Sequence, residues 1–164
     1  MTGRAVAAIL ASTLFCTPVA AAGGDAALER LLLCQDSWSD WQKTGDPRLK
    51  LLAEHLSAAF ARHGNDGYFV PKVPTVVLGF RVLQVYPGSV GMGVGFSILV
   101  DATFETAQQE LERALGKPLK QCDAGDGMKS CEREVAPMRT LALMAQDAPN
   151  NTSSLIGCYY FYEK

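Results

Sequence analysis

The sequence has few of the side chains that most enzymes and metal sites use. Its 164 residues include two histidines, His55 and His63. On one predicted helix these lie about 80° apart around the axis and roughly two turns distant, so they cannot share a metal ion. No G-x-S-x-G or S-x-x-K motif occurs, and both motifs mark serine nucleophiles. We therefore expect no metal and no cofactor, and the sequence favours a protein without catalytic activity.

The chain also lacks runs of one charge and long apolar segments. It carries 15 basic and 17 acidic side chains, a net charge of −2 at pH 7, and no basic cluster. A nucleic-acid-binding protein needs such a cluster, so nucleic acid is not an expected partner. The apolar stretch Ala5–Phe15 is too short for a bilayer, which requires about 20 residues. We expect no stable membrane insertion.

The N-terminal residues have the order of a secretory signal peptide. A basic residue, Arg4, precedes the apolar stretch Ala5–Phe15, and then come Pro18 and the small-residue run Ala20–Ala22. A basic start, an apolar middle and an A-x-A site are typical of signals removed during export. The pattern predicts cleavage near Ala22.

An alternative for this segment is lipidation at Cys16. A lipoprotein signal normally has a small residue before the cysteine, and here that residue is Phe15. With cleavage at Ala22, residues 1–22 form the signal peptide and residues 23–164 form a single domain. The mature protein is then expected in the periplasm, or secreted.

Four cysteines remain after that cleavage: Cys34, Cys122, Cys131 and Cys158. An even number in an exported chain indicates two disulfides. Three pairings are possible, and we favour Cys34–Cys158 with Cys122–Cys131, because the second pair is separated only by the turn-rich "DAGDGMKS". Zinc is the alternative, but no two cysteines have the C-x₂₋₄-C spacing of structural zinc sites.

Helical periodicity is present in three segments. Apolar residues recur at 3- and 4-residue steps over 25–43 and over 46–64, where Asp46 and Pro47 are suitable for the start of a helix. A third helix is predicted over 104–115, because Thr103 can cap it. Gly116 and Pro118 follow it, as expected for a helix end.

Strand patterns occupy the remainder and set the expected fold class. Strands are predicted over 75–86, 90–100, 134–145 and 155–162, with Pro137 marking an edge or a bulge. Residues 86–89, "YPGS", have the composition of a type II turn. The order predicts an α+β fold: a four-stranded antiparallel sheet, made of two hairpins joined by a helix, packed with two N-terminal helices and stapled by two disulfides.

The stretch "GSVGMGVGFSILV", residues 88–100, is rich in glycine but leads into a strand. A phosphate-binding loop opens a helix, so that interpretation is excluded. Read with period two, one face is apolar and the other is nearly bare backbone at Gly91, Gly93 and Gly95. Bare backbone permits close approach, either by the protein's own helix or a bent strand, or by a partner.

These observations lead to two functional hypotheses. The first is an exported periplasmic protein-binding module, most plausibly an inhibitor or immunity protein against an envelope-acting toxin or hydrolase. Its binding element is the predicted hairpin, with the candidate residues Tyr86, Pro87, Gly88, Ser89, Val90, Gly91 and Met92. The alternative is a small envelope enzyme or small-ligand-binding protein with a pocket between helices and sheet.

Overall fold

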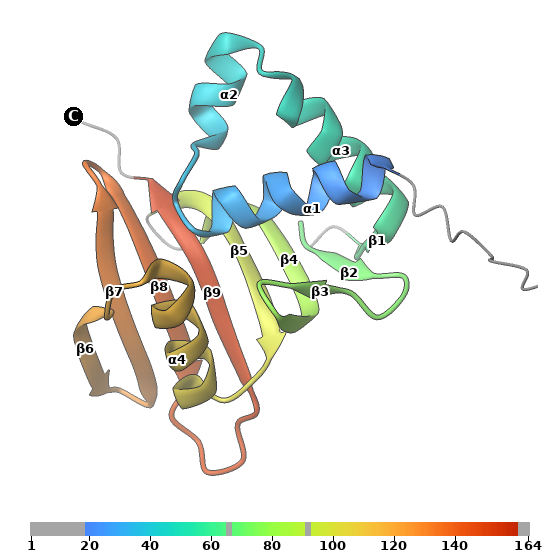
Figure 1. The fold of residues 1–164 in the computed structure, drawn as a ribbon. Helices are drawn as coiled ribbons and strands as arrows, with labels where there is room; N and C mark the ends of the chain where they lie inside the picture. Colours follow the sequence, from blue (N-terminus) through green and yellow to red (C-terminus); the bar gives the residue numbers. More distant parts are fainter. Residues whose placement is uncertain (1–18, 65–66, 91–92, 161–164) are drawn as a thin grey trace, which may run out of the picture.

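A computed structural model describes residues 19–64, 67–90 and 93–160 (Figure 1). Within these ranges the helices are α1 (Val19–Leu32), α2 (Trp38–Thr44), α3 (Pro47–Ala59) and α4 (Phe104–Leu115). The strands are β1 (Phe60–Arg62), β2 (Phe69–Pro71), β3 (Val76–Val77), β4 (Phe80–Val90), β5 (Gly93–Asp101), β6 (Lys120–Gly125), β7 (Met128–Ala136), β8 (Arg139–Gln146) and β9 (Ser153–Tyr160).

The α+β class and the two disulfides are confirmed, but the four-stranded sheet is wrong. The strands form one nine-stranded antiparallel sheet in the order β1-β2-β4-β5-β9-β8-β7-β6, with β3 paired to β4. The two predicted hairpins are joined through β5 and β9, which pair from Val94↔Tyr160 to Asp101↔Ser153. The additional strands come from turns inside the predicted strands 75–86 and 134–145, from the disulfide loop, and from residues 60–62 and 69–71, which were expected in a helix and a loop.

One such turn divides the predicted strand 134–145. The pair Ala136↔Arg139 closes a two-residue connection at Pro137 and Met138, and Met138 has φ 61°. Proline presets φ at the first central position, and a type II turn requires positive φ at the second. Pro137 therefore ends β7 and starts a reversal into β8. The β7–β8 register also shifts between Glu134 and Ala136, directly before Pro137, as at a β-bulge.

The turn expected in the short disulfide loop joins two strands that the sequence did not predict, β6 and the first half of β7. Asp126 and Gly127 have φ of 53° and 75° and connect Gly125 to Met128 in register. Asp-Gly with two positive φ values is the preferred two-residue hairpin turn, because its twist matches that of the strands. The disulfide Cys122–Cys131 thus crosses a β6–β7 hairpin.

The predicted helix over 25–43 is two helices. Cys34 adopts φ 56°, and the Arg30 carbonyl accepts the backbone N–H groups of Gln35 and Asp36. The Ser37 hydroxyl then accepts from the Asp40 backbone N–H and starts α2. The positive φ turns the chain where the disulfide Cys34–Cys158 connects the end of α1 to β9.

The helices α3 and α4 both begin at the predicted N-caps, and α4 also ends where predicted. Asp46 caps α3, which ends at Ala59 instead of near Gly64 because Phe60 is already extended and begins β1. Helix α4 confirms the prediction, with Thr103 as N-cap and Gly116 at φ 63° beyond its end. Its buried residues Ala107 and Leu111 face the sheet core.

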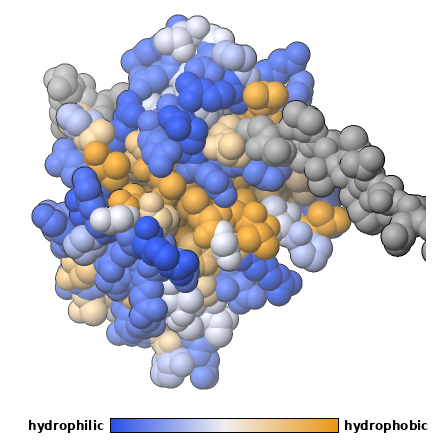
Figure 2. All heavy atoms as spheres, in the orientation of Figure 1, coloured by the Kyte–Doolittle hydropathy of each residue, from blue (hydrophilic) through white to orange (hydrophobic). Residues whose placement is uncertain are grey.

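The core lies between the sheet and the helices α1 and α4, which both lie in front of the strands in Figure 1. Fully buried side chains include Leu28 and Leu31 of α1, Phe96 and Ile98 of β5, and Leu141 of β8. Figure 2 shows apolar residues gathered in a band below α1, between more hydrophilic regions. None of the helices within the described ranges is long and apolar enough to cross a membrane.

Candidate protein-binding surface

The β4–β5 hairpin extends further than the sequence predicted. Its ladder continues through Gly88↔Gly95 and Ser89↔Val94 to Val90↔Gly93, so residues 86–89 are strand and the predicted type II turn there is wrong. Pro87 can occupy this strand because the outer neighbours of β4 pair further back, β2 at Val85 and β3 at Phe80 and Arg81. A proline is tolerated in an edge segment, where its missing N–H interrupts no ladder.

The predicted binding residues from Tyr86 to Val90 therefore lie in the second half of β4, next to its connection to β5. Tyr86 and Pro87 are half-buried and lie opposite Ser97 and Phe96. Gly88, Ser89 and Val90 continue the strand. Gly91 and Met92 lie outside the described residues.

Three rings gather beside this half of β4. The rings of His63 and Tyr68 are stacked with centroids 4.7 Å apart, and those of Tyr68 and Tyr86 are 5.5 Å apart. His63 is exposed and the two tyrosines are half-buried. The Tyr86 hydroxyl donates to the Gln84 side-chain oxygen, and burial, followed by the proximity of Tyr68, raises the pKa of Tyr86. We call His63, Tyr68 and Tyr86 the aromatic patch.

Sequence reasoning missed two members of the aromatic patch. It placed His63 on a helix and Tyr68 in a loop, whereas the β1–β2 hairpin brings them together through the bond from the His63 backbone N–H to the Tyr68 carbonyl, 3.0 Å. The single pair Phe69↔Val85 then places Tyr68 beside Tyr86. No local pattern signals this, because it depends on which strand β2 pairs with.

The bare glycine face is occupied at Gly95 by the protein's own β9. A Cβ added to Gly95 would lie 1.9 Å from the Cys158 carbonyl oxygen, and one added to Gly157 would lie 2.6 Å from Ser97 Cβ. Real Cβ atoms do not approach other atoms so closely. Gly95 and Gly157 thus permit a close approach of β5 and β9, and at Gly95 the neighbour is a strand rather than a helix or a partner.

The remaining titratable groups do not converge on a reaction centre. His55 is buried on α3, with its Nε2 2.9 Å from the Asp25 Oδ1 and its ring against Phe60. His63 lies in the β1–β2 turn, so the two histidines do not share a helix. Among the described residues no group of three His, Cys, Asp or Glu side chains is placed to hold a metal ion.

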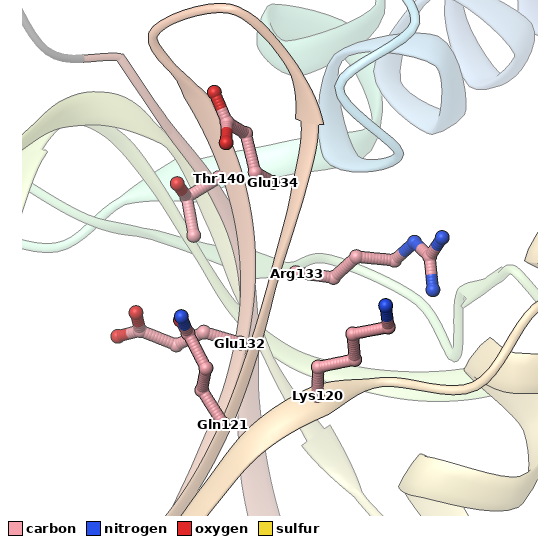
Figure 3. A pocket seen from close by; sticks show the side chains of 6 residues that line it. All are labelled: Lys120, Gln121, Glu132, Arg133, Glu134 and Thr140. Carbon is pink, nitrogen blue, oxygen red and sulfur yellow. The ribbon is translucent and has the colours of Figure 1, made fainter.

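A charged cavity beside β6, β7 and β8 also lacks such a convergence. A cavity of about 390 Å³ is lined by Lys120, Gln121, Glu132, Arg133, Glu134 and Thr140. In Figure 3 the Glu132 and Glu134 side chains lie on one side of the strands, whereas Arg133 and Lys120 point to the other. The Arg133 guanidinium donates to the Pro118 carbonyl. The acidic and basic side chains therefore do not point toward one common position in this cavity.

Two tyrosines of β9 belong to the core rather than to the surface. Tyr159 and Tyr160 are each 7% exposed, and burial raises the pKa of each to about 12. The Tyr160 hydroxyl donates to the Asp36 carbonyl at 2.9 Å, which ties β9 to the segment before α2.

The candidate site on the described surface is therefore the aromatic patch, beside the part of β4 that pairs only with β5. Comparison with known protein families, with curated proteins and with solved structures finds no match to this chain.

Proposed function

We propose that this protein is an exported protein-binding module that contacts its partner through the β4–β5 hairpin and the aromatic patch. Its concrete form is an inhibitor or immunity protein against an envelope-acting toxin or hydrolase. The observation that carries the proposal is the cluster of the His63, Tyr68 and Tyr86 rings beside the segment of β4 beyond Val85. Among the described residues, this segment pairs on one side only.

Such a surface has the properties of a protein-binding anchor. Tyrosine side chains are enriched among the residues that dominate binding energy, because they bury a large area and keep a polar end. The ring contacts and the Tyr86–Gln84 hydrogen bond hold these rings in place before binding. Pre-organised side chains lose less conformational entropy when a partner covers them.

Two observations support export. Disulfides persist mainly in oxidising compartments such as the periplasm, and this domain has two. Among the residues whose burial is described, the first core residue is Ala27, which lies beyond the predicted cleavage near Ala22 and stays in the mature chain.

The test uses the mature protein with a photo-reactive phenylalanine analogue at position 68. Irradiation in an envelope extract identifies the partner by mass spectrometry, and the partner is then purified and its activity measured with increasing amounts of the protein. We expect stoichiometric inhibition of a toxin or hydrolase. A partner that is bound but not inhibited would reduce the proposal to a binding module.

Alanine variants locate the surface. Tyr68→Ala and Tyr86→Ala should each weaken binding by about tenfold or more, since anchor truncations cost about 2 kcal/mol. Leu51→Ala is the control, because Leu51 is a large apolar residue at the surface of α3 that is not part of the aromatic patch. Equal affinities for all three variants, with unchanged urea midpoints, would show that the aromatic patch is not the binding surface.

A further inference from the structure

The two disulfides differ in how easily a solvent molecule reaches them. Cys34 and Cys158 are 2% and 0% exposed, so both sulfurs of that bridge lie in the core. Cys131 is also fully buried, but its partner Cys122 is exposed on β6. An external thiolate attacks a disulfide at an accessible sulfur, so access separates the two bridges chemically.

A cavity leads directly to the exposed bridge. It has a volume of about 310 Å³ and lies between α4 and the β6–β7 hairpin. Its lining consists of Phe104, Glu105 and Gln108 from α4, Cys122, Asp123 and Ala124 from β6, and Lys129, Ser130 and Cys131 from β7. Both cysteines of the bridge form part of the wall, and the space is sufficient for a small thiol.

Strand β6 is held by little apart from this bridge. Each of its six residues is exposed. It pairs with β7 alone among the described strands, and the register shifts between Lys120 and Asp123, so Gln121 and Cys122 stand outside the ladder. At its start, Leu119 is buried and its backbone N–H is bound by the Glu112 carboxylate at 2.9 Å. The segment that can detach therefore begins after Leu119.

We propose that Cys122–Cys131 is a thiol–disulfide exchange site, which a low-molecular-weight thiol opens while Cys34–Cys158 and the core stay intact. The incoming thiolate attacks the Cys122 Sγ, the S–S bond breaks, and Cys131 leaves as a thiolate that takes a proton from water. A second thiolate attacks the mixed disulfide on Cys122, which releases the oxidised thiol pair and the Cys122 thiolate. The two protein sulfurs are reduced and two thiol molecules are oxidised.

Reduction then changes the outer edge of the sheet. Without the bridge, β6 is attached only through its pairing with β7, which is interrupted at Gln121 and Cys122, and through Leu119. Its release leaves the outer side of β7 without a partner strand, and an unpaired edge is a template for strand addition. The site is independent of the aromatic patch, which lies at the β1–β2–β4 end of the sheet.

The first test reduces the wild-type protein with increasing glutathione, blocks free thiols with N-ethylmaleimide and maps the labelled peptides. Cys122 and Cys131 should be labelled at least about tenfold faster than Cys34 and Cys158, because only the first bridge is accessible. Hydrogen exchange of the half-reduced protein should increase in residues 120–125 and leave β5 and β9 protected. Simultaneous labelling of all four cysteines, or unchanged exchange in β6, would overturn the proposal.

A pair of variants tests the role of the cavity. Gln108→Trp places a large ring in the cavity, whereas Gln109→Trp, one residue along the same helix, places it at an exposed position outside the lining. The first should slow labelling of Cys122 and Cys131 severalfold and the second should leave it unchanged. Equal rates in both variants would show that the thiol does not enter through this cavity. Urea midpoints establish that both variants are folded, and the wild-type experiment decides the main claim if one is not.

Discussion

Gly95→Ala is expected to destabilise the protein through a backbone collision. The added Cβ would lie 1.9 Å from the Cys158 carbonyl oxygen, 2.9 Å from its carbonyl carbon and 3.2 Å from the Tyr159 Cα. All three atoms belong to the main chain of β9, so no side-chain rotation can relieve the contact. The two central strands must separate, and they carry the buried residues Phe96 and Ile156.

The magnitude follows from two opposing terms. Overpacking in a close-packed interior costs typically about 1–3 kcal/mol, and a rigid backbone neighbour places this case near the upper end. Alanine restores roughly 0.5–1 kcal/mol relative to glycine in a strand, because the unfolded chain loses less entropy. We therefore expect a net loss of about 2 kcal/mol, which corresponds to a fall in Tm of roughly 4–8 °C.

The assay is urea denaturation of the oxidised protein, followed by circular dichroism. Gly125→Ala is the matched control, because a Cβ there meets nothing within 4 Å. That variant should be at least as stable as the wild type. If Gly95→Ala and Gly125→Ala have the same midpoint, the close approach of β5 and β9 is not real and the reasoning fails.

A double-variant cycle tests the same contact from the other strand. At Gly157 the nearest atom to an added Cβ is the Ser97 Cβ, a side-chain atom, at 2.6 Å. Ser97→Gly should therefore recover part of the stability lost in Gly157→Ala, and it should not rescue Gly95→Ala. Purely additive effects in both pairs would contradict this assignment.

Three further predictions concern the cross-links and the titrating groups. Removing Cys34–Cys158, which closes 124 residues, should cost about 5 kcal/mol, and removing Cys122–Cys131, which closes 9, about 3 kcal/mol on the chain-entropy model, as measured by urea denaturation of serine variants. Because burial raises the pKa of Tyr159 and Tyr160 to about 12, the unfolded chain loses these protons first, so stability should fall as the pH rises from about 10 to about 12. Absorbance at 295 nm follows the ionisation, and Tyr159→Phe with Tyr160→Phe should flatten the dependence. The Arg48 side chain and backbone N–H lower the pKa of Asp46 to about 2, so its contribution should disappear as the pH falls from about 4 to about 2, and a carboxyl titration by NMR should show no such inflection in Asp46→Asn.

The sequence predicted only part of the candidate surface. The composition of "YPGS" predicts Tyr86 and Pro87 in a turn, yet both lie in β4, and Tyr86 contributes to the surface through the rings beside it. His63 and Tyr68 join Tyr86 because β1, β2 and β4 pair, and that pairing links residues with no common periodicity. Strand partners are chosen by packing across the whole domain, which a local pattern does not contain.

By itself, the sequence determined the features whose physical cause lies within a few residues. Helix α4 begins after its N-cap Thr103 and ends before Gly116, because the cap and the glycine stop are both local signals. The cysteine pairing followed from an even count and one short separation.

Only the tertiary structure decided the number and order of the strands in the sheet, and it explains why residue 95 is a glycine. The turn at Pro137 and Met138 divides a segment that the pattern assigned to one strand, and the strands on either side of Asp126 and Gly127 lie in a segment that was expected to be a loop. Gly95 is bare because β9 approaches it, and β9 lies about sixty residues further along the chain, a contact that exists only when the nine strands close on one core.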